Sequence, residues 1–241
     1  MTVGPKTGTG PGVITPDGCA VELYARLPAW REPGVIHEAA GDGATILELG
    51  CGTGRVTHPL VELGHEVTAV DESPEMLARV RGARTVLARI QDLDLSGRRF
   101  AAVVLGSHLF NVPDDDLLGA WLATCRRHVA DDGSVLIEHH PPSWFEAVAD
   151  GERTAADGLI FRTRGVRRPG PGLVSMTMEY AYDDQVWTQS FTTREVTEAS
   201  LPRVLDRAGL AFAGYLTDDR SWCRAVRRQI PAREGGREAG E

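Results

Sequence analysis

The chain has 241 residues, of which 42% are hydrophobic and 25% charged, and its formal net charge is -8. This length suits one large α/β domain with a sizeable core. The acidic balance argues against a duplex nucleic-acid partner, whose phosphates require a basic surface. No run of about 18 apolar residues occurs, so we expect no membrane-spanning segment.

Both ends of the chain have the composition of loose segments. Residues 1–16 are rich in Gly, Pro and Thr and lack the apolar stretch of a secretory signal. We expect a flexible arm over residues 1–16, one domain over 17–230 and a flexible tail over 231–241. The four cysteines form no Cys-x-x-Cys pair, which favours reduced thiols in a cytoplasmic protein and no zinc site.

In the first half of the chain, short apolar runs alternate with helical stretches. Helical patterning begins over residues 17–27 and 31–40, interrupted by Pro28 and Pro33. Strands are then predicted at residues 45–49, 66–70, 85–90, 100–105 and 134–138, and helices at 54–63, directly after Ser73, and at 114–130. This alternation predicts parallel βαβ units and an open twisted sheet.

After residue 138 the pattern changes to alternating apolar and polar residues. Residues 159–168, 173–182 and 185–193 predict three antiparallel strands, and a helix at 198–208 is followed by strands at 210–216 and 222–226. The predicted fold is therefore a doubly wound, seven-stranded, mostly parallel sheet, with a small antiparallel insertion over residues 159–193.

A glycine-rich loop follows the first of these strands. Residues 46–54 read ILELGCGTG, in which closely spaced glycines let the backbone approach a ligand at the carboxyl end of a strand. Arg55 stands where a dinucleotide-binding loop usually has a further glycine, which disfavours a nicotinamide or flavin. For the loop alone, a tight turn without a ligand remains the alternative.

Acidic residues end the next two strands. Asp71 ends the second strand, where a carboxylate can accept hydrogen bonds from both ribose hydroxyls. Asp92 and Leu93 end the third strand, where they can meet the amino group of an adenine, although a turn-forming Asp is the alternative for Asp92. The loop and the acids together predict an adenosine-containing cofactor.

These residues resemble the class I S-adenosylmethionine (SAM)-dependent methyltransferase family. The runs ELGCGTGR and GHEVTAVDESPEML are similar to its first two motifs, RIQDLDL and AAVVLGSHLF to the next two, and CRRHVADDGSVLIEHH to the stretch through the fifth strand. The resemblance is strong over residues 45–140 and extends elsewhere only to topology. It implies SAM as cofactor and S-adenosylhomocysteine (SAH) as product.

The resemblance also implies which residues hold the cofactor. The glycines would line the methionine and ribose, the acids would orient the loop and hold the ribose, and side chains of the following helix would flank the adenine. The implied residues are Tyr24, Glu48, Gly50, Gly52, Gly54, Asp71, Glu72, Met76, Asp92, Leu93 and Gly106. Tyr24 would lie over the methionine part.

Three histidines follow the fourth and fifth strands and are candidate catalytic bases. A sulfonium methyl needs mainly alignment in a site closed to water, and a hydroxyl acceptor also benefits from a base. His108 follows the fourth strand, and His139 and His140 follow the fifth. Adjacent strand residues point to opposite faces, so the last two form no metal site with each other. Histidines that only cap or pack the strand ends are the alternative.

Residues 114–116, three successive acids, could suggest a divalent-metal site, but their place at a helix N-terminus favours first-turn acids. The antiparallel insertion resembles the added sheet of sugar-amine and natural-product methyltransferases, which covers the substrate cleft and sometimes dimerises. Its aromatic side chains could equally form the core of that sheet. The candidate substrate-binding residues are Trp144, Phe145, Tyr180 and Trp187.

The sequence therefore predicts a cytoplasmic, SAM-dependent methyltransferase that acts on an O or N atom of a small-molecule acceptor in secondary metabolism, with a homodimer left open. No nucleic acid, membrane or metal is expected as partner. The run LGSHLFNV lacks the Asn/Asp-Pro-Pro-aromatic signature of nucleic-acid methyltransferases that act on base amino groups, so that alternative is disfavoured. A protein that binds SAM or SAH without methyl transfer is the other alternative.

Overall fold

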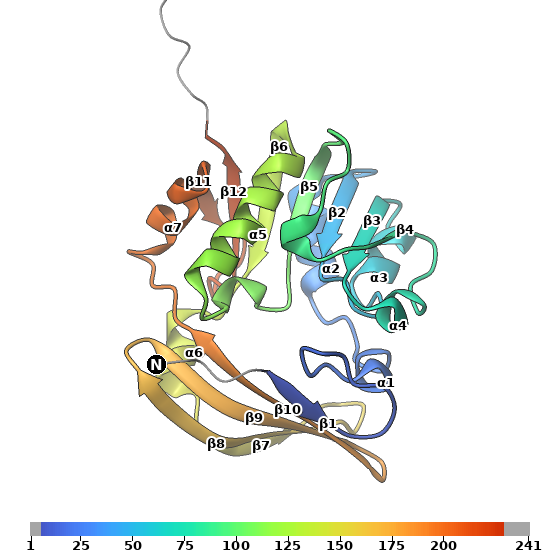
Figure 1. The fold of residues 1–241 in the computed structure, drawn as a ribbon, viewed down its shortest axis with the longest axis vertical. Coiled ribbons are helices and arrows are strands. Elements are labelled where there is room, and N and C mark those ends of the chain that lie inside the picture. The colour runs from blue at the N-terminus through green and yellow to red at the C-terminus, as the bar shows by residue number, and fades with distance from the viewer. Residues whose placement is uncertain (1–5, 229–241) are drawn as a thin grey trace, which may run out of the picture.

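The structure is a computed structural model, and it describes residues 6–228. The tail predicted for residues 231–241 and the first five residues of the predicted arm lie outside this range. Within the described part, the chain forms a seven-stranded sheet and a separate five-stranded sheet (Figure 1).

The seven-stranded sheet has the order β11-β12-β6-β5-β2-β3-β4. The five strands β6, β5, β2, β3 and β4 pair in parallel, whereas β12 pairs antiparallel with both β6 and β11. The strands are β2 (Thr45–Leu49), β3 (Glu66–Asp71), β4 (Arg84–Leu87), β5 (Phe100–Leu105), β6 (Val129–Glu138), β11 (Leu210–Tyr215) and β12 (Trp222–Arg227). The predicted doubly wound, mostly parallel sheet is confirmed.

Helices cover both faces of this sheet. On one face, α5 (Asp115–His128) and α7 (Leu201–Arg207) contribute Leu118, Leu122 and Leu205 to the larger core. On the other face, α2 (Glu32–Ala40) and α3 (Thr57–Glu62) contribute Ile36 and Leu60. The shorter helical segments are α1 (Val21–Tyr24), α4 (Pro74–Leu77), α6 (Pro142–Ala147), η1 (Ile90–Asp92) and η2 (Leu109–Asn111).

Two helix starts agree with the sequence signals. Asp114 Oδ1 accepts a hydrogen bond from Leu117 N at 2.9 Å, so Asp114 is the N-cap of α5 and the interpretation as helix-start acids is confirmed. Ser73 Oγ accepts from Met76 N at 3.1 Å and caps α4, in which Pro74 is the first residue. Helix α4 itself has only four residues.

The second sheet has two strands more than the sequence predicts. Its order is β1-β10-β9-β8-β7, and all neighbours are antiparallel. The three expected strands are β8 (Ile160–Gly170), β9 (Leu173–Tyr182) and β10 (Gln185–Arg194), and the additional ones are β1 (Thr7–Thr9) and β7 (Gly151–Thr154).

Strand β1 belongs to the stretch for which the sequence predicts a loose arm. It pairs with β10, with Gly8 opposite Gln189. Trp187 Nε1 donates to Pro11 O at 2.9 Å, which fixes the chain just after the strand. The residues that hold this segment lie in β10, so its own Gly- and Pro-rich composition carries no sign of the pairing.

The second sheet lies beneath the seven-stranded sheet in the view of Figure 1, and α6 joins β6 to it. The buried Asn111 connects the two parts, because its Oδ1 accepts from His140 N at 2.8 Å and its Nδ2 donates to Arg194 O at 2.9 Å. In the described residues, no helix is long and apolar enough to cross a membrane.

Candidate functional site

The glycine loop after β2 turns back against the end of β3. Gly50 N and Cys51 N both donate to Val70 O, at 2.8 and 2.9 Å. The three glycines have φ values of 70°, 57° and 88° in order, which favour glycine. A Cβ on Gly50 would lie 2.9 Å from Leu109 Cδ1, and one on Gly54 would lie 2.7 Å from His58 Nε2. A Cβ on Gly52 would meet only Met76 Sδ, at 3.9 Å, so the loop can approach a ligand there.

Asp71, at the end of β3, holds this loop in place. Its Oδ2 accepts from Gly52 N at 2.8 Å and its Oδ1 accepts from Ser73 N at 2.9 Å. Burial raises the pKa of Asp71, and the two backbone amides lower it. Each carboxylate oxygen retains a lone pair that can accept a ribose hydroxyl. Glu72, the next residue, is exposed, and Met76 is buried beneath Gly52.

Acidic side chains also lie on the opposite side of the loop. Glu48 is buried and accepts from Thr57 Oγ1 at 2.5 Å, and burial raises its pKa to about 7. Glu32, at the start of α2, accepts at Oε1 from Arg55 Nη1 at 2.5 Å. The sequence did not predict the Glu32–Arg55 contact, because nothing in the local pattern of α2 points to the glycine loop.

A small cavity joins the ends of β2 and β5 under the loop. Its walls include Glu32, Glu48, Gly50, Gly106 and Glu138. Glu32 Oε2 is buried and has no hydrogen-bond partner in the described part of the chain. An unpaired buried acceptor, a carboxylate suited to a ribose and an open approach over Gly52 fit the adenosine and amino-acid parts of SAM.

The two residues predicted on the adenine side, Asp92 and Leu93, differ in burial. Asp92 is exposed and lies 3.5 Å from Arg89 Nε, so its carboxylate is available at the surface. Leu93 is only 2% exposed and packs in the main core, and its carbonyl accepts from Arg127 Nη1 at 2.7 Å. The side chain of Leu93, which follows the 3-10 turn η1, lies in the core, so the predicted adenine contact of Leu93 is left to its backbone.

Tyr24 links α1 to the second sheet. Its hydroxyl lies 3.3 Å from Gln189 Oε1 on β10, and burial raises the pKa of Tyr24 well above its usual range. Helix α1 also contacts the cofactor side of the molecule, because Glu22 pairs with Arg79 just after α4. The segment that carries Tyr24 therefore bridges β10 and the region beside Asp71.

The turn after β5 is strained. Ser107 and His108 have φ values of 52° and 55°, a left-handed conformation that is uncommon for residues other than glycine. Glu138 at the end of β6 stabilises this turn, since its Oε2 accepts from Ser107 N at 2.6 Å. Glu138 Oε1 lies 3.9 Å from His108 Nε2. Strain of this kind is often retained at functional sites.

The other two histidines pack against aromatic neighbours, with His139 in the core and His140 half-buried. The His140 ring is stacked between His108 and Trp144, with centroid distances of 3.8 Å on each side. Burial lowers the pKa of His140 to about 2, assisted by the neighbouring His108 and His139. His139 is 2% exposed between Phe110 and Tyr215, and burial lowers its pKa as well.

The structure thus separates the three candidate bases. The side chain of His108 is 39% exposed and His140 is half-buried, so an acceptor can reach either ring, whereas the buried His139 corresponds to the packing alternative. The alternation of side chains along a strand indicated that His139 and His140 could not both face one substrate. It did not indicate which of the three histidines is exposed.

The four candidate substrate-binding residues also differ in burial. Trp187 is fully buried against Ala20 and Leu23, so it forms part of a small core beneath the N-terminal segment. Phe145 is 3% exposed and packs on Val174 and Met176. Trp144 is half-buried and stacks on His140, and Tyr180 lies half-buried beside Phe161 at 5.5 Å between ring centroids.

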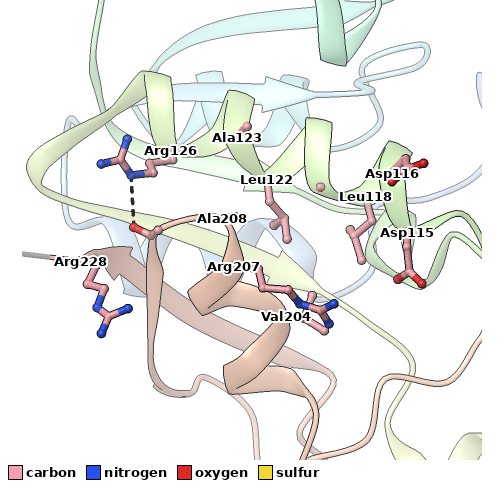
Figure 2. Close-up of a pocket in the computed structure, with 12 residues that line it drawn as sticks. Asp115, Asp116, Leu118, Leu122, Ala123, Arg126, Val204, Arg207, Ala208 and Arg228 are labelled. Carbon is pink, nitrogen blue, oxygen red and sulfur yellow. Dashed lines mark hydrogen bonds between the residues drawn. The ribbon is translucent and has the colours of Figure 1, made fainter.

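A larger hollow in the described structure lies elsewhere. It has a volume of about 620 Å³ and lies between α5 and α7, where Leu118, Leu122 and Val204 form part of its wall (Figure 2). None of the predicted cofactor or catalytic residues lines it. The candidate site is therefore located by its polar groups and strand ends and not by cavity size.

Comparison with known proteins identifies similar methyltransferases. Residues 46–133 match the model of a family described as methyltransferase domain. The chain is 27% identical over 177 residues to the cypemycin N-terminal methyltransferase of a Streptomyces species, a match that covers 66% of this chain and 72% of that protein.

Solved structures show the same fold. The CcbJ methyltransferase of Streptomyces caelestis superposes with a TM-score of 0.71 and 20% identity, covering 87% of this chain and 96% of that one. SAM-bound CalS10 of Micromonospora echinaspora, an amino pentose methyltransferase involved in calicheamicin biosynthesis, gives a TM-score of 0.63 and 21% identity, with coverages of 86% and 94%.

Proposed function

We propose that this chain, a SAM-dependent methyltransferase with the class I fold, methylates a nitrogen or oxygen atom of a small-molecule acceptor. The observation that carries the proposal is the proximity of the glycine loop and the strained turn at His108. Strands β2 and β5 are neighbours with Leu49 opposite Leu105, so the loop and the turn begin at the same edge of the sheet. Ligands of open α/β sheets bind at this edge.

Different residues would contact the cofactor and the acceptor. When bound, SAM supplies a methyl group on a positively charged sulfur, which needs alignment more than activation. Asp71 would hold the ribose and Gly52 would allow the close approach of the loop. His108 would accept a proton at Nε2 from a hydroxyl acceptor, and Glu138 would stabilise the resulting imidazolium. A neutral amine needs no base before transfer.

The similar proteins favour nitrogen as the first acceptor atom to test. The cypemycin enzyme is named for an N-terminus, and CalS10 for an amino pentose. The acceptor would lie between the end of β6 and the second sheet, beside Trp144 and Tyr180. We place the reaction in the cytoplasm and in the biosynthesis of small molecules.

The test is a transfer assay with SAM that carries a labelled methyl group, over a panel of small amines, phenols and carboxylic acids. We expect label in at least one acceptor class. With a hydroxyl acceptor, His108→Ala should lower kcat about 100-fold or more, while calorimetry finds SAM affinity near normal. If SAM binds but no acceptor receives the label, the protein binds SAM without methyl transfer. Label transfer to RNA or DNA would replace the small-molecule proposal.

A further inference from the structure

A buried ion pair lies directly beside the glycine loop. Arg55, the residue after Gly54, donates from Nη1 to Glu32 Oε1 at 2.5 Å and to Pro28 O at 3.2 Å. The guanidinium carbon also lies 5.3 Å from the centre of the Trp30 ring. Only 12% of the Arg55 side chain and 8% of the Glu32 side chain are exposed. Desolvation offsets much of the attraction in a buried pair, so stability alone is a weak reason for this arrangement.

Only one oxygen of Glu32 is used by the pair. The other, Oε2, is buried and has no partner among residues 6–228. It belongs to the wall of the small cavity that also includes Gly50 and Gly106, at the ends of β2 and β5. A buried acceptor without a donor is costly, which indicates that a donor from outside the protein chain completes it.

The volume of the cavity and the charge of the residues that line it restrict the chemical identity of that donor. Its volume of about 10 Å³ matches one group of the size of a water molecule. Glu32, Glu48 and Glu138 all line it, so the surroundings favour a cation. An alkylammonium group has this size, a positive charge, three N–H donors and no acceptor.

We propose that Glu32 Oε2 binds the α-ammonium group at the amino-acid end of SAM and SAH, and that Arg55 holds the other oxygen of Glu32 in place. This inference rests on SAM being the cofactor. Gly50 and Gly106 line the same cavity, and both belong to the strand ends at which the cofactor is expected. The competing occupant is a water molecule that pairs Glu32 Oε2 with Trp222 Nε1, which also lacks a partner in the described residues.

The test compares two ligands that differ at the amino-acid end. SAH carries the α-ammonium group, whereas 5′-methylthioadenosine keeps the adenosine and sulfur and lacks that end. Glu32→Gln preserves the shape and one acceptor for Arg55 but removes the charge. Calorimetry should find SAH binding weakened about tenfold or more by Glu32→Gln, with 5′-methylthioadenosine binding unchanged.

Glu66→Gln is the matched control. Glu66 is the first residue of β3, at the amino end of the strand and away from the glycine loop, and it forms an exposed pair with Arg98. Neither ligand should therefore bind differently to this variant. If Glu32→Gln weakens both ligands equally, Glu32 supports the loop and not the ammonium group. If SAH binding is unchanged, the cavity holds water. No methyl transfer is measured, so a chain that binds as expected and transfers no methyl would overturn only the proposed function.

Discussion

At the scale of single residues, Asp71 combines observed contacts within the loop with a proposed contact to the ribose. It accepts from Gly52 N and Ser73 N, so it shapes the loop as well as facing the expected ribose. Asp71→Ala should weaken SAH binding by about 1–3 kcal/mol, because a charge-assisted contact is lost and two backbone amides lose their acceptor. Calorimetry measures the effect, with the exposed and distant Asp206→Ala as control. Unchanged SAH affinity would contradict the ribose assignment.

His140 provides a pH-dependent stability effect. Its pKa is about 2 in the folded protein, against an ordinary value of 6.5, because the ring is buried beside His108 and His139. Below about pH 6.5 the unfolded chain binds a proton that the folded chain does not, so the folded state loses stability as the pH falls. Above that pH, His140 is neutral in both the folded and the unfolded chain, so its titration no longer lowers the free energy of unfolding.

His140→Phe isolates this effect because phenylalanine can keep the stack between His108 and Trp144 but cannot bind the proton. Between about pH 6.5 and pH 5, the variant should lose about 2 kcal/mol less of its free energy of unfolding than the wild type. Urea unfolding at the two pH values measures the difference. The same pH dependence in both proteins would mean that His140 is protonated as readily when folded as when unfolded.

At the scale of elements, strand β1 depends on a close passage between two glycines. A Cβ on Gly8 would lie 2.0 Å from the carbonyl oxygen of Gly18, and a backbone atom cannot move aside as a flexible side chain would. Gly8→Ala should therefore detach β1 from β10 at a cost of about 1–3 kcal/mol. Faster amide hydrogen exchange at residues 7–9 and 188–190 would report the detachment.

Gly34→Ala is the matched control for this element. Gly34 lies within α2, and an added Cβ would meet nothing within 4 Å. Because alanine favours a helix more than glycine does, the control should be neutral or stabilising by up to about 1 kcal/mol. If both variants leave the exchange at β1 and β10 unchanged, the Gly8–Gly18 passage does not hold the strand.

At the scale of the whole molecule, Asn111 joins the two sheets. Its side chain is almost fully buried and satisfies His140 N from the end of β6 and Arg194 O from the end of β10. Asn111→Ala should lower the free energy of unfolding by about 2–4 kcal/mol, because both backbone groups lose their partner inside the protein. Asn111→Asp keeps an acceptor for His140 N but places a buried carboxylate oxygen against Arg194 O, so it should lose at least as much as Asn111→Ala.

Denaturant unfolding followed by circular dichroism and by tryptophan fluorescence measures this coupling. In the wild type we expect one transition for both probes, because the sheets share buried contacts. A loss below about 1 kcal/mol in Asn111→Ala would mean that other contacts join the sheets and that Asn111 is incidental.

The sequence by itself determined the features that depend on neighbouring residues. Apolar runs predicted the strands of the main sheet, Ser73 and Asp114 predicted two helix starts, and the glycine spacing with Asp71 indicated the end of the sheet at which we propose that the cofactor binds. These signals are local because a strand, a cap and a tight turn each need only a few consecutive residues.

Only the tertiary structure decided which side chains meet across the fold. The Glu32–Arg55 pair spans 23 positions, the link from Trp187 to Pro11 spans 176, and the stack of His108, His140 and Trp144 joins two strand ends. The same is true of Leu93, which the turn η1 places in the core. Burial and pKa depend on these distant partners, and therefore a pattern of adjacent residues could nominate three histidines but could not show that His139 is buried while His108 and His140 are partly exposed.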